Sequence, residues 1–419
     1  MARTRLIAAL ILTYVAFAML LNSVGTVILQ SISSFAVTKP EASTLEGFKD
    51  ITIAVVSFLT ASYLPRLGLR NALIGALLLA IAGCVVMPLA GSFGAAQLHF
   101  AMVGAAFAIA KVVVYSMIGL VTDSPRKHAS LTSLIEGMFM VGVLSSYWVF
   151  SAFIDPTGLR WLNAYWVLAG VTALALALLL SAPVDARRGH DGDDAIEAEG
   201  APILAMLKLA ALPLVLIFIL CAFIFVLIEQ GIGTWLPTFN NEVLHLPAQM
   251  SVQAASLFAA CIALGRFGAG AVMARFDWYP VLNICLGLLA ALIILVLPLA
   301  DGLRPGPIAS WNDAPLAAFL FPLIGFALAP IYPTIVSVML SAMPGRSHPP
   351  LMGLVVVFSA LGGTTGSLVT GQLFAHLDGR TAFTLMLVPT AMLAGGLFLL
   401  RRRIQVTTSG TGSIERLAR

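Results

Sequence analysis

The sequence predicts an all-α integral membrane protein with twelve transmembrane helices arranged as two six-helix halves. Of its 419 residues, 60% are hydrophobic and only 10% are charged, whereas a soluble domain carries about 25% charged residues. The apolar residues form blocks long enough to cross a bilayer, which takes about 20 residues in a helix. Backbone groups in lipid need internal hydrogen bonds, and the short alternating segments of a membrane β-barrel are missing, so we expect these blocks to be helices.

Polar residues separate the candidate spans, whose ends are expected to be accurate to about 2–4 residues. The spans are 6–30, 43–64, 71–91, 96–119, 131–154, 161–181, 209–234, 250–274, 278–299, 315–341, 349–374 and 380–401. The longest hydrophilic stretch follows the sixth span. It predicts a first bundle at 1–182, a cytoplasmic linker at 183–207, a second bundle at 208–403 and a cytoplasmic tail at 404–419.

An internal echo supports two repeated halves. Span four contains Phe107–Lys111 (FAIAK) and span ten contains Phe326–Pro330 (FALAP), and each span is the fourth of its half. Repeated halves are typical of transporters that bind their substrate in a central cleft.

The positive charges predict the orientation. Of the 23 lysines and arginines, sixteen fall on the side of the N-terminus. The exceptions are, on the other side, Lys39, Arg160, Arg304 and Arg380 and, within spans, Lys49, Lys111 and Arg266. Because positive loops stay inside, we expect a multi-pass protein of the cell (inner) membrane with both termini cytoplasmic. We also expect the first block, which follows Arg3 and Arg5, to be an uncleaved helix.

Dispersed basic residues form no nucleic-acid-binding patch, so the expected partners are the lipid bilayer and a small-molecule substrate. No nucleic acid is expected, and we expect a monomer. The four cysteines lie inside apolar blocks, where packing is their expected role.

Span two carries three ionisable residues on one helical face, Glu46, Lys49 and Asp50. An ionisable group in the membrane is costly unless it is paired or hydrated, so it marks a candidate functional site. We predict a polar cavity wall or an outer gate here, with Asp50 as a candidate proton site. The alternative is a helix that begins later and leaves Glu46 and Lys49 in solvent.

Lys111 in span four and Glu136 in span five are expected at similar depths. Lys111 lies roughly 22 Å below the outer end of its helix and Glu136 roughly 8 Å above the cytoplasmic end, within a core of about 30 Å. We therefore predict an ion pair that substrate or proton binding breaks; the alternative is a permanent structural pair. Tyr115, one turn beyond Lys111, shares its face.

Span seven carries Glu229, Gln230 and Trp235 near its outer end. Glu229 is expected to line the cleft or bridge the halves, or else to lie at the interface with water. Trp235 is expected either in the interfacial aromatic belt or as a stacking surface for a sugar ring.

Three further polar residues are candidates in spans one, eight and ten. Asn22 can hydrogen-bond a ligand or a neighbouring helix. Tyr332 lies between Pro330 and Pro333, where a broken helix indicates either a binding site or a structural kink. We expect Arg266, near the cytoplasmic end of its span, to pack against a helix or anchor a loop.

Enzymatic motifs are missing: the sequence has no HExxH, Walker or Rossmann pattern and no metal-ligand cluster. We therefore expect no enzyme activity and no cofactor, with transport driven by a proton gradient or by another ion or substrate gradient.

The two halves and their hydrophilic connection resemble the major facilitator superfamily. Pro65–Arg70 (PRLGLR) resembles a degraded form of the glycine-and-basic loop motif of that family. Gly265–Gly268 (GRFG), followed by Ala274–Asp277 (ARFD), resembles the counterpart in the second half. The resemblance covers nearly the whole chain and implies the major facilitator fold.

Within the superfamily the chain is most similar to the fucose, galactose and glucose proton symporters. The similar segments are Glu229–Leu236 (EQGIGTWL) and Pro330–Ile335 (PIYPTI), together with Asn22. Those symporters tend to carry an acid in span four where this chain has Lys111. The resemblance therefore places proton coupling at Asp50, Glu136 or Glu229.

The expected function is secondary active transport by alternating access, with proton-coupled uptake of a small polar metabolite such as a sugar or sugar derivative. The expected site lies near Lys111, Glu136, Asn22 and Tyr332. Alternatives are a proton-coupled importer of an organic anion, since a lysine in the cleft would bind a sugar acid or carboxylate, an exporter of drugs or metabolites, and a transport-dead sensor or membrane-embedded enzyme.

Overall fold

The computed structural model describes residues 2–122, 124–155, 158–182, 206, 208–300, 308, 310–344 and 347–409. Within these residues the chain is helical and has no β-strand, as the sequence predicts. Eleven segments are long and apolar enough to cross a membrane, and the charged helix α3 (Lys39–Leu67) is not among these eleven. The predicted linker at 183–207 and most of the predicted tail at 404–419 lie outside the described residues.

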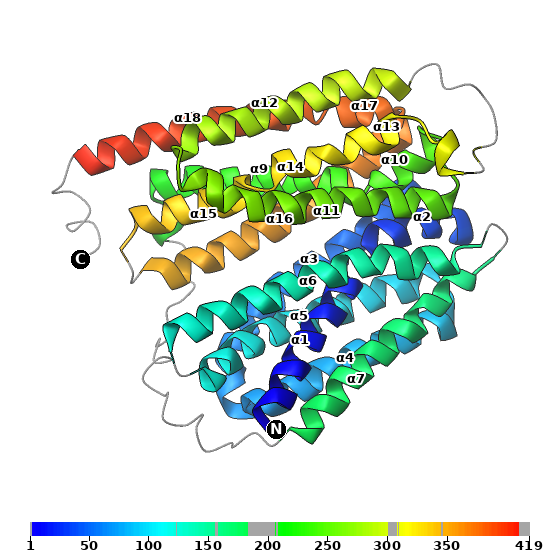
Figure 1. Cartoon of the computed structure of the whole chain (residues 1–419), viewed down its shortest axis with the longest axis horizontal. Helices are drawn as coiled ribbons and strands as arrows, with labels where there is room; N and C mark the ends of the chain where they lie inside the picture. The colour runs from blue at the N-terminus through cyan, green and yellow to red at the C-terminus, as the bar shows by residue number, and fades with distance from the viewer. Residues whose placement is uncertain are drawn as a thin grey trace.

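The first half occupies the lower part of Figure 1. Besides α3, its helices are α1 (Ala2–Leu21), α2 (Val24–Phe35), α4 (Leu69–Ala90), α5 (Phe93–Val121), α6 (Pro125–Phe153) and α7 (Ala164–Ser181). Helix α4 packs on α5 and α7, and α1 packs on α6 and α7. These contacts close one bundle around an apolar core.

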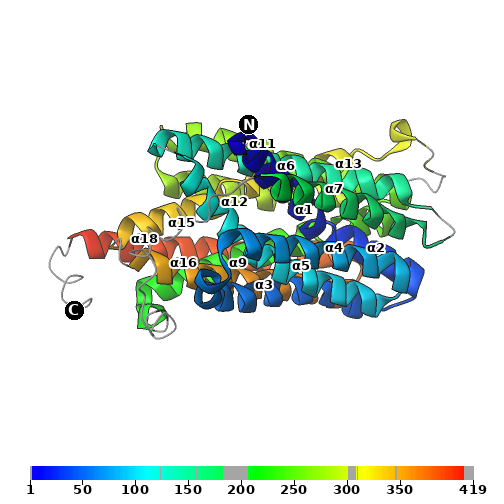
Figure 2. The same ribbon diagram turned by 90° about the horizontal axis from the view of Figure 1, so that it is seen from below.

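The second half occupies the upper part of Figure 1. Its helices are α9 (Pro213–Gly233), α10 (Leu236–Glu242), α11 (Ala248–Met273), α12 (Trp278–Val296), α13 (Ala317–Leu320), α14 (Ile324–Leu328), α15 (Ile331–Ala342), α16 (His348–His376), α17 (Gly379–Thr384) and α18 (Leu387–Ser409). The long helices of the second half run lengthwise in Figure 1, whereas α1 and α7 of the first half run obliquely to them; Figure 2 shows both halves from below.

Helix α3 is long enough to cross a membrane, and protein covers its charged residues Glu46, Lys49 and Asp50. Its 29 residues span roughly 43 Å, more than a hydrocarbon core of about 30 Å. It packs against α5 in its own half and α16 in the other. The helix begins at Lys39 and Glu46 is fully buried, so the alternative that leaves Glu46 and Lys49 in solvent is wrong.

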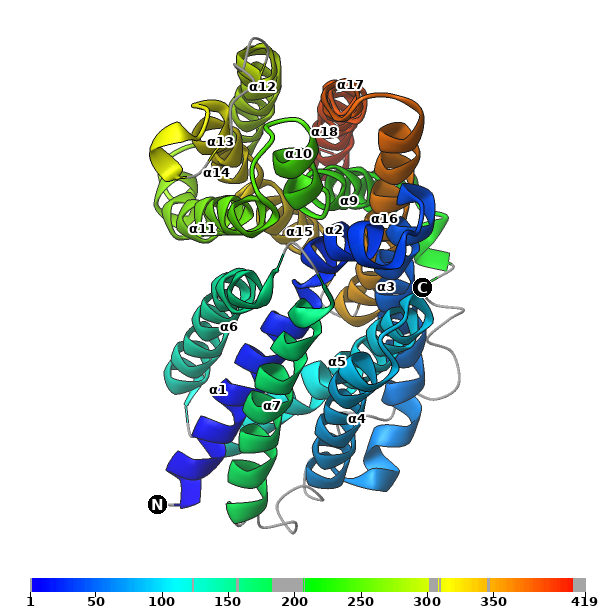
Figure 3. The ribbon, with the colours of Figure 1, turned by 90° about the vertical axis from the view of Figure 1, so that its right-hand side faces the viewer.

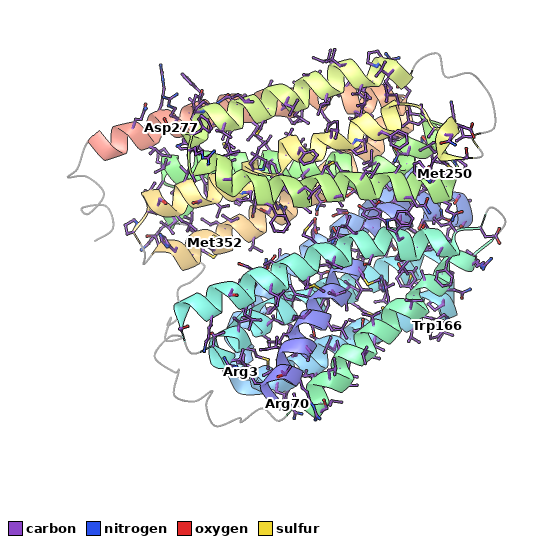
Figure 4. All side chains as sticks on the ribbon, viewed as in Figure 1. Arg3, Arg70, Trp166, Met250, Asp277 and Met352 are labelled. Carbon is purple, nitrogen blue, oxygen red and sulfur yellow. The ribbon has the colours of Figure 1, made fainter. Side chains whose placement is uncertain are left out.

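The two halves meet at one end of the molecule and diverge toward the other (Figure 1). The contacts pair α3 with α16, α6 with α11 and α2 with α10, and Figure 3 shows α2, α3, α10 and α16 from this side. We call this end, which carries Lys39 and Leu377, the closed end, and the opposite end the open end. Arg3, Arg70, Asp277 and Met352 lie toward the open end in Figure 4.

Glycines permit the close contact at the closed end. A Cβ atom at Gly371 of α16 would lie 2.7 Å from the Ser43 Cβ of α3 and 2.8 Å from the Trp235 ring. A Cβ atom at Gly25 of α2 would collide with the Thr234 carbonyl oxygen of the other half. At these glycines the backbone of one half therefore lies directly against atoms of the other half. Only small residues allow helices to approach so closely.

The first helix of each half is broken, which the continuous spans 6–30 and 209–234 did not anticipate. The break between α1 and α2 falls at Asn22 and Ser23, whose side chains donate to the carbonyls of Ala18 (2.9 Å) and Leu20 (2.7 Å). Side-chain bonds of this kind compete with regular helix bonding, and the Ala18 carbonyl also accepts the Asn22 backbone N–H at 3.2 Å. The break between α9 and α10 falls at Thr234 and Trp235, and Gly25 contacts Thr234. The two breaks therefore meet between the halves.

Candidate functional site: a charged cavity between the halves

A cavity of about 200 Å³ lies between the halves beside the two helix breaks. Both halves contribute polar, charged and aromatic side chains to its wall. Its lining includes Asn22, Glu46, Lys49, Phe139, Met140 and Tyr147 from the first half and Glu229, Gln230, Thr234, Phe258, Ile262 and Arg266 from the second. An apolar cavity with a few convergent polar groups is typical of a small-molecule site.

Glu46, Lys49 and Asp50 form a buried ion cluster on α3, which we call the acidic triad. Lys49 Nζ donates to Glu46 Oε1 and lies 3.4 Å from Asp50 Oδ1. All three residues are buried: Glu46 is 0% exposed, Lys49 6% and Asp50 8%. Glu46 and Lys49 line the cavity, as expected, while the Asp50 carboxylate faces Gly363 of α16. Two carboxylates thus share one lysine at the boundary between the halves.

The acidic triad is linked to the other half through Thr234. The Thr234 hydroxyl lies 3.3 Å from Glu46 Oε2 and also 3.3 Å from Gln230 Oε1. Gln230 also lines the cavity. Thr234 was not among the predicted residues, because a lone threonine in an apolar span gives no signal in the sequence.

A second ion pair faces the cavity from the other half. Arg266 of α11 lies 3.7 Å from Glu229 Oε1 of α9, and the Arg266 side chain is 44% exposed. Glu229 lines the cavity as one prediction proposed. Arg266, which was expected to pack against a helix or anchor a loop, joins α11 to α9 through this ion pair, and it also lines the cavity. Closeness to the end of a span does not exclude a residue from a cavity that opens toward that end.

Asn22 occupies the predicted place in the cavity wall. The break in the first helix puts it there, since residues of a broken turn project their side chains where a regular helix would continue. The Asn22 side-chain nitrogen donates a hydrogen bond to the Ala18 carbonyl. The side-chain oxygen is therefore the group that can accept a hydrogen bond from a ligand.

Lys111 and Glu136 do not form the predicted ion pair among the described side chains. Glu136 instead accepts a hydrogen bond from the Tyr115 hydroxyl, and Lys111 lies 6.0 Å from the centre of the Phe107 ring. Both residues are exposed and lie outside the cavity lining. The prediction rested on the equal depth of the two residues in the membrane. Which side chains meet also depends on the rotation of each helix about its own axis, which depth does not give.

Lys111 and Glu136 nevertheless connect to the cavity wall through aromatic rings. Phe107 lies 6.4 Å from Phe139, which lines the cavity, and Tyr14 contacts both Phe139 and Tyr115 at 5.9 and 6.1 Å between ring centres.

Trp235 and Tyr332 lie outside the cavity lining in this conformation. Trp235 is fully buried, and its indole nitrogen donates to the Ser367 carbonyl at 3.0 Å. Neither an interfacial belt position nor a sugar-stacking role fits that burial. Tyr332 stacks on Phe225, with 5.7 Å between ring centres, and its hydroxyl lies 3.2 Å from Ser359 Oγ. The helix is interrupted just before Tyr332, between α14 and α15, as Pro330 predicted.

Comparison with known families decides the class of the protein. The sequence model of the Major Facilitator Superfamily matches residues 6–347, which is most of the chain. The chain belongs to the major facilitator superfamily. It is therefore a membrane transporter and not an enzyme, as the sequence predicted. No curated protein sequence matches this transporter.

Solved structures of other superfamily transporters share the fold. A bacterial homologue of the human lysosomal transporter Spinster, in an inward-facing and occupied conformation, has a TM-score of 0.77 at 15% identity, covering 96% of this chain and 97% of that chain. The nucleoside transporter NupG has a TM-score of 0.73 at 12% identity, covering 95% and 98%. A D-xylose–proton symporter has a TM-score of 0.70 at 16% identity, covering 93% and 96%.

An ion pair at the rim of the closed end also joins the halves of this superfamily transporter. Lys39 Nζ of α3 lies 2.7 Å from Glu242 Oε2 of α10 and donates to the Phe374 carbonyl at 3.0 Å. Both side chains are partly exposed, at 24% and 33%, so water screens the pair.

Replacing Glu242 with glutamine is expected to loosen the closed end modestly. A partly exposed pair contributes about 0.2–1 kcal/mol, so the population with separated closed ends should rise about 1.5- to fivefold. Electron–electron distance measurements between spin labels at Ser33→Cys and Leu377→Cys, which lie on opposite halves, would report that population. The exchanged pair, Lys39→Glu with Glu242→Lys, should restore the original distances; a swap no better than the single change would contradict the role of the pair.

Proposed function

We propose that this transporter takes up a small uncharged polar metabolite, with a sugar or sugar derivative favoured, together with a proton. The composition of the cavity wall carries the proposal. Phe139 and Phe258 offer apolar faces on which the C–H face of a ring can stack, and Asn22, Tyr147 and Gln230 offer hydrogen-bond donors and acceptors beside them. A hydroxylated ring presents the matching surfaces.

The charges favour an uncharged substrate over an organic anion. Both cations of the cavity wall already face carboxylates: Lys49 has Glu46 and Asp50, and Arg266 has Glu229. With every group ionised, three carboxylates oppose two cations, which leaves one excess negative charge. The case for an anion rested on Lys111, which lies outside the cavity lining.

The acidic triad supports proton coupling. Burying an uncompensated charge costs several kcal/mol, and the triad holds two carboxylates around one ammonium group. One bound proton would make the triad neutral. The proton symporters that this chain resembles tend to carry an acid in span four, where this chain has Lys111. Coupling through the triad therefore assigns the proton to α3 instead.

The proposed cycle is alternating access, with the halves rocking about the contact between their broken helices. Under the positive-inside orientation both termini are cytoplasmic, and the closed end faces outward. This conformation is then open to the cytoplasm, with the substrate site ready to release. Substrate and proton would each shift the balance by their differential affinity for the two states.

Uptake of radiolabelled sugars into proteoliposomes with an imposed pH gradient tests the proposal. We expect accumulation of at least one neutral sugar when the outside is acidic, abolished by collapsing the gradient. In Asp50→Asn the triad carries no excess negative charge and no longer gains from binding a proton. We therefore expect accumulation to fall at least about tenfold, while exchange of sugar across the membrane continues. Accumulation of sugar acids but not sugars, or drug extrusion without sugar uptake, would favour the organic-anion or exporter alternative.

A further inference from the structure

The hydroxyl of Thr234 lies between two acceptors that belong to different halves. Glu46 Oε2 of α3 and Gln230 Oε1 of α9 are each 3.3 Å from Thr234 Oγ. A threonine hydroxyl has one proton to donate, although it can accept as well. With Glu46 ionised, the two acceptors therefore compete for one donor. One further proton is needed for both hydrogen bonds, Thr234 to Glu46 and Thr234 to Gln230, to form at the same time.

We propose that Thr234 is the positioning residue that makes closure of the closed end depend on protonation of Glu46. When Glu46 takes up a proton, its carboxyl O–H donates to Thr234 Oγ, and Thr234 donates onward to Gln230 Oε1. Both bonds are then made at once, and the only species added is the proton. This inference rests on the proposed proton coupling and names the contact through which it acts.

Closure changes the hydrogen bonds and the hydration of Glu46 differently in its two protonation states. If Glu46 is ionised, closure removes water from a carboxylate, and Thr234 has to leave Gln230 in order to donate across the interface. Stripping water from a charged group is costly. If Glu46 is protonated, closure adds the Glu46–Thr234 bond and keeps the Thr234–Gln230 bond. Protonation therefore favours the closed end, which is the direction that proton uptake from outside requires.

Because of the position of Thr234, this hydrogen bond acts directly on the contact between the halves. Thr234 is 6% exposed and Glu46 is fully buried, so bulk water does not substitute for the bond in this conformation. The Thr234 backbone lies at the break between α9 and α10, where its carbonyl touches Gly25 of α2. The hydroxyl thus lies at the point where the two broken helices meet.

Other charged and titratable groups face Glu46 and have to be included in any pH dependence. They are Lys49 and Asp50 on α3, Tyr147 on α6, Glu229 on α9 and Arg266 on α11. Lys49 remains next to Asp50 after Glu46 is protonated, so the triad keeps one matched ion pair. Glu229 and Arg266 form their own pair within the second half, which leaves the proton-dependent change at Glu46.

The test measures separation of the closed end against pH in the full-length transporter, with spin labels at Ser33→Cys and Leu377→Cys after the native cysteines are replaced. In the otherwise unchanged protein, we expect acidic buffer to reduce the separated population up to about tenfold, the upper end of the scale for one hydrogen bond between neutral groups. In Thr234→Val, which keeps the shape and removes the hydroxyl, we expect that pH response to disappear. Thr234→Ser should retain it.

A fourth variant separates a coupling role from a structural one. Glu46→Gln carries an amide that can donate to Thr234 at every pH, so its closed end should stay together in acidic and alkaline buffer alike. If Thr234 had a structural role alone, Thr234→Val would lower the thermal stability and leave the pH response intact. A pH response that survives in Thr234→Val, or a closed end that ignores pH in the unchanged protein, overturns the inference. Absence of sugar accumulation with an intact pH response would instead overturn the proposed function.

Discussion

Replacement of Lys49 with methionine should destabilise the transporter strongly. The Lys49 side chain is 7% exposed and faces two carboxylates, so its removal leaves buried charges without compensation. Breaking a buried pair from one side costs about 3–5 kcal/mol. A clearly lower apparent Tm in a thermal-shift measurement in detergent is the expected result.

Lys39→Met is the matched control for this change. It removes the same residue type from the same helix, but its partner Glu242 is partly exposed, so the loss should stay within about 1 kcal/mol. Removing all three charges of the triad, by Lys49→Met with Glu46→Gln and Asp50→Asn, should recover most of the stability, because neutral side chains carry no such penalty. If Lys49→Met were as stable as Lys39→Met, the triad would not be a buried ion cluster.

Replacement of Gly25 with valine should abolish transport while leaving the halves folded. A side chain at this position collides with the Thr234 carbonyl, and the Thr234 backbone carbon and Cα lie only 3.2 and 3.3 Å from the added Cβ. Overpacking of this kind costs about 1–3 kcal/mol, and only the conformation with a closed end bears that cost. The closed population should therefore fall roughly 5- to 150-fold.

Two measurements on Gly25→Val check this expectation. Spin labels at Ser33→Cys and Leu377→Cys should report a longer distance, and sugar uptake should fall at least about tenfold. Gly75→Val is the control, since Gly75 is also a helical glycine but has no atom within 4 Å of its added Cβ; it should behave like the unchanged protein. Normal distances in Gly25→Val would show that the contact between the broken helices yields without moving the halves.

The sequence predicts the fold well because hydropathy and charge placement act along the chain. Membrane-length apolar blocks and the bias of lysine and arginine are one-dimensional signals, and the apolar blocks correspond to the long helices between α1 and α18. The breaks at Asn22 and Thr234 are different. They involve contacts between halves that are far apart in sequence. The first break has no proline beside it, and the second is marked only by Pro237 in the first turn of α10.

The site was predicted in part for a similar reason. Depth along a helix can be read from residue number, so Glu46, Lys49 and Glu229 were found as candidates. Rotation about the helix axis cannot, which explains why Lys111 and Glu136 do not pair and why Trp235 is buried against Ser367 instead of lining the cavity. Arg266 lines the cavity as well as joining α11 to α9, although it lies toward the end of its helix.

The excess of one carboxylate over the cations in the central cavity has an electrical consequence. In the proposed cycle the loaded carrier, with one proton and a neutral substrate, moves no net charge, whereas the empty carrier returns with one negative charge. A membrane potential acts on that charge with about 2.3 kcal/mol per 100 mV across the full field. An inside-negative voltage would thus accelerate the return of the empty carrier and leave the loaded step unaffected, so transport current would be set by the resetting half of the cycle.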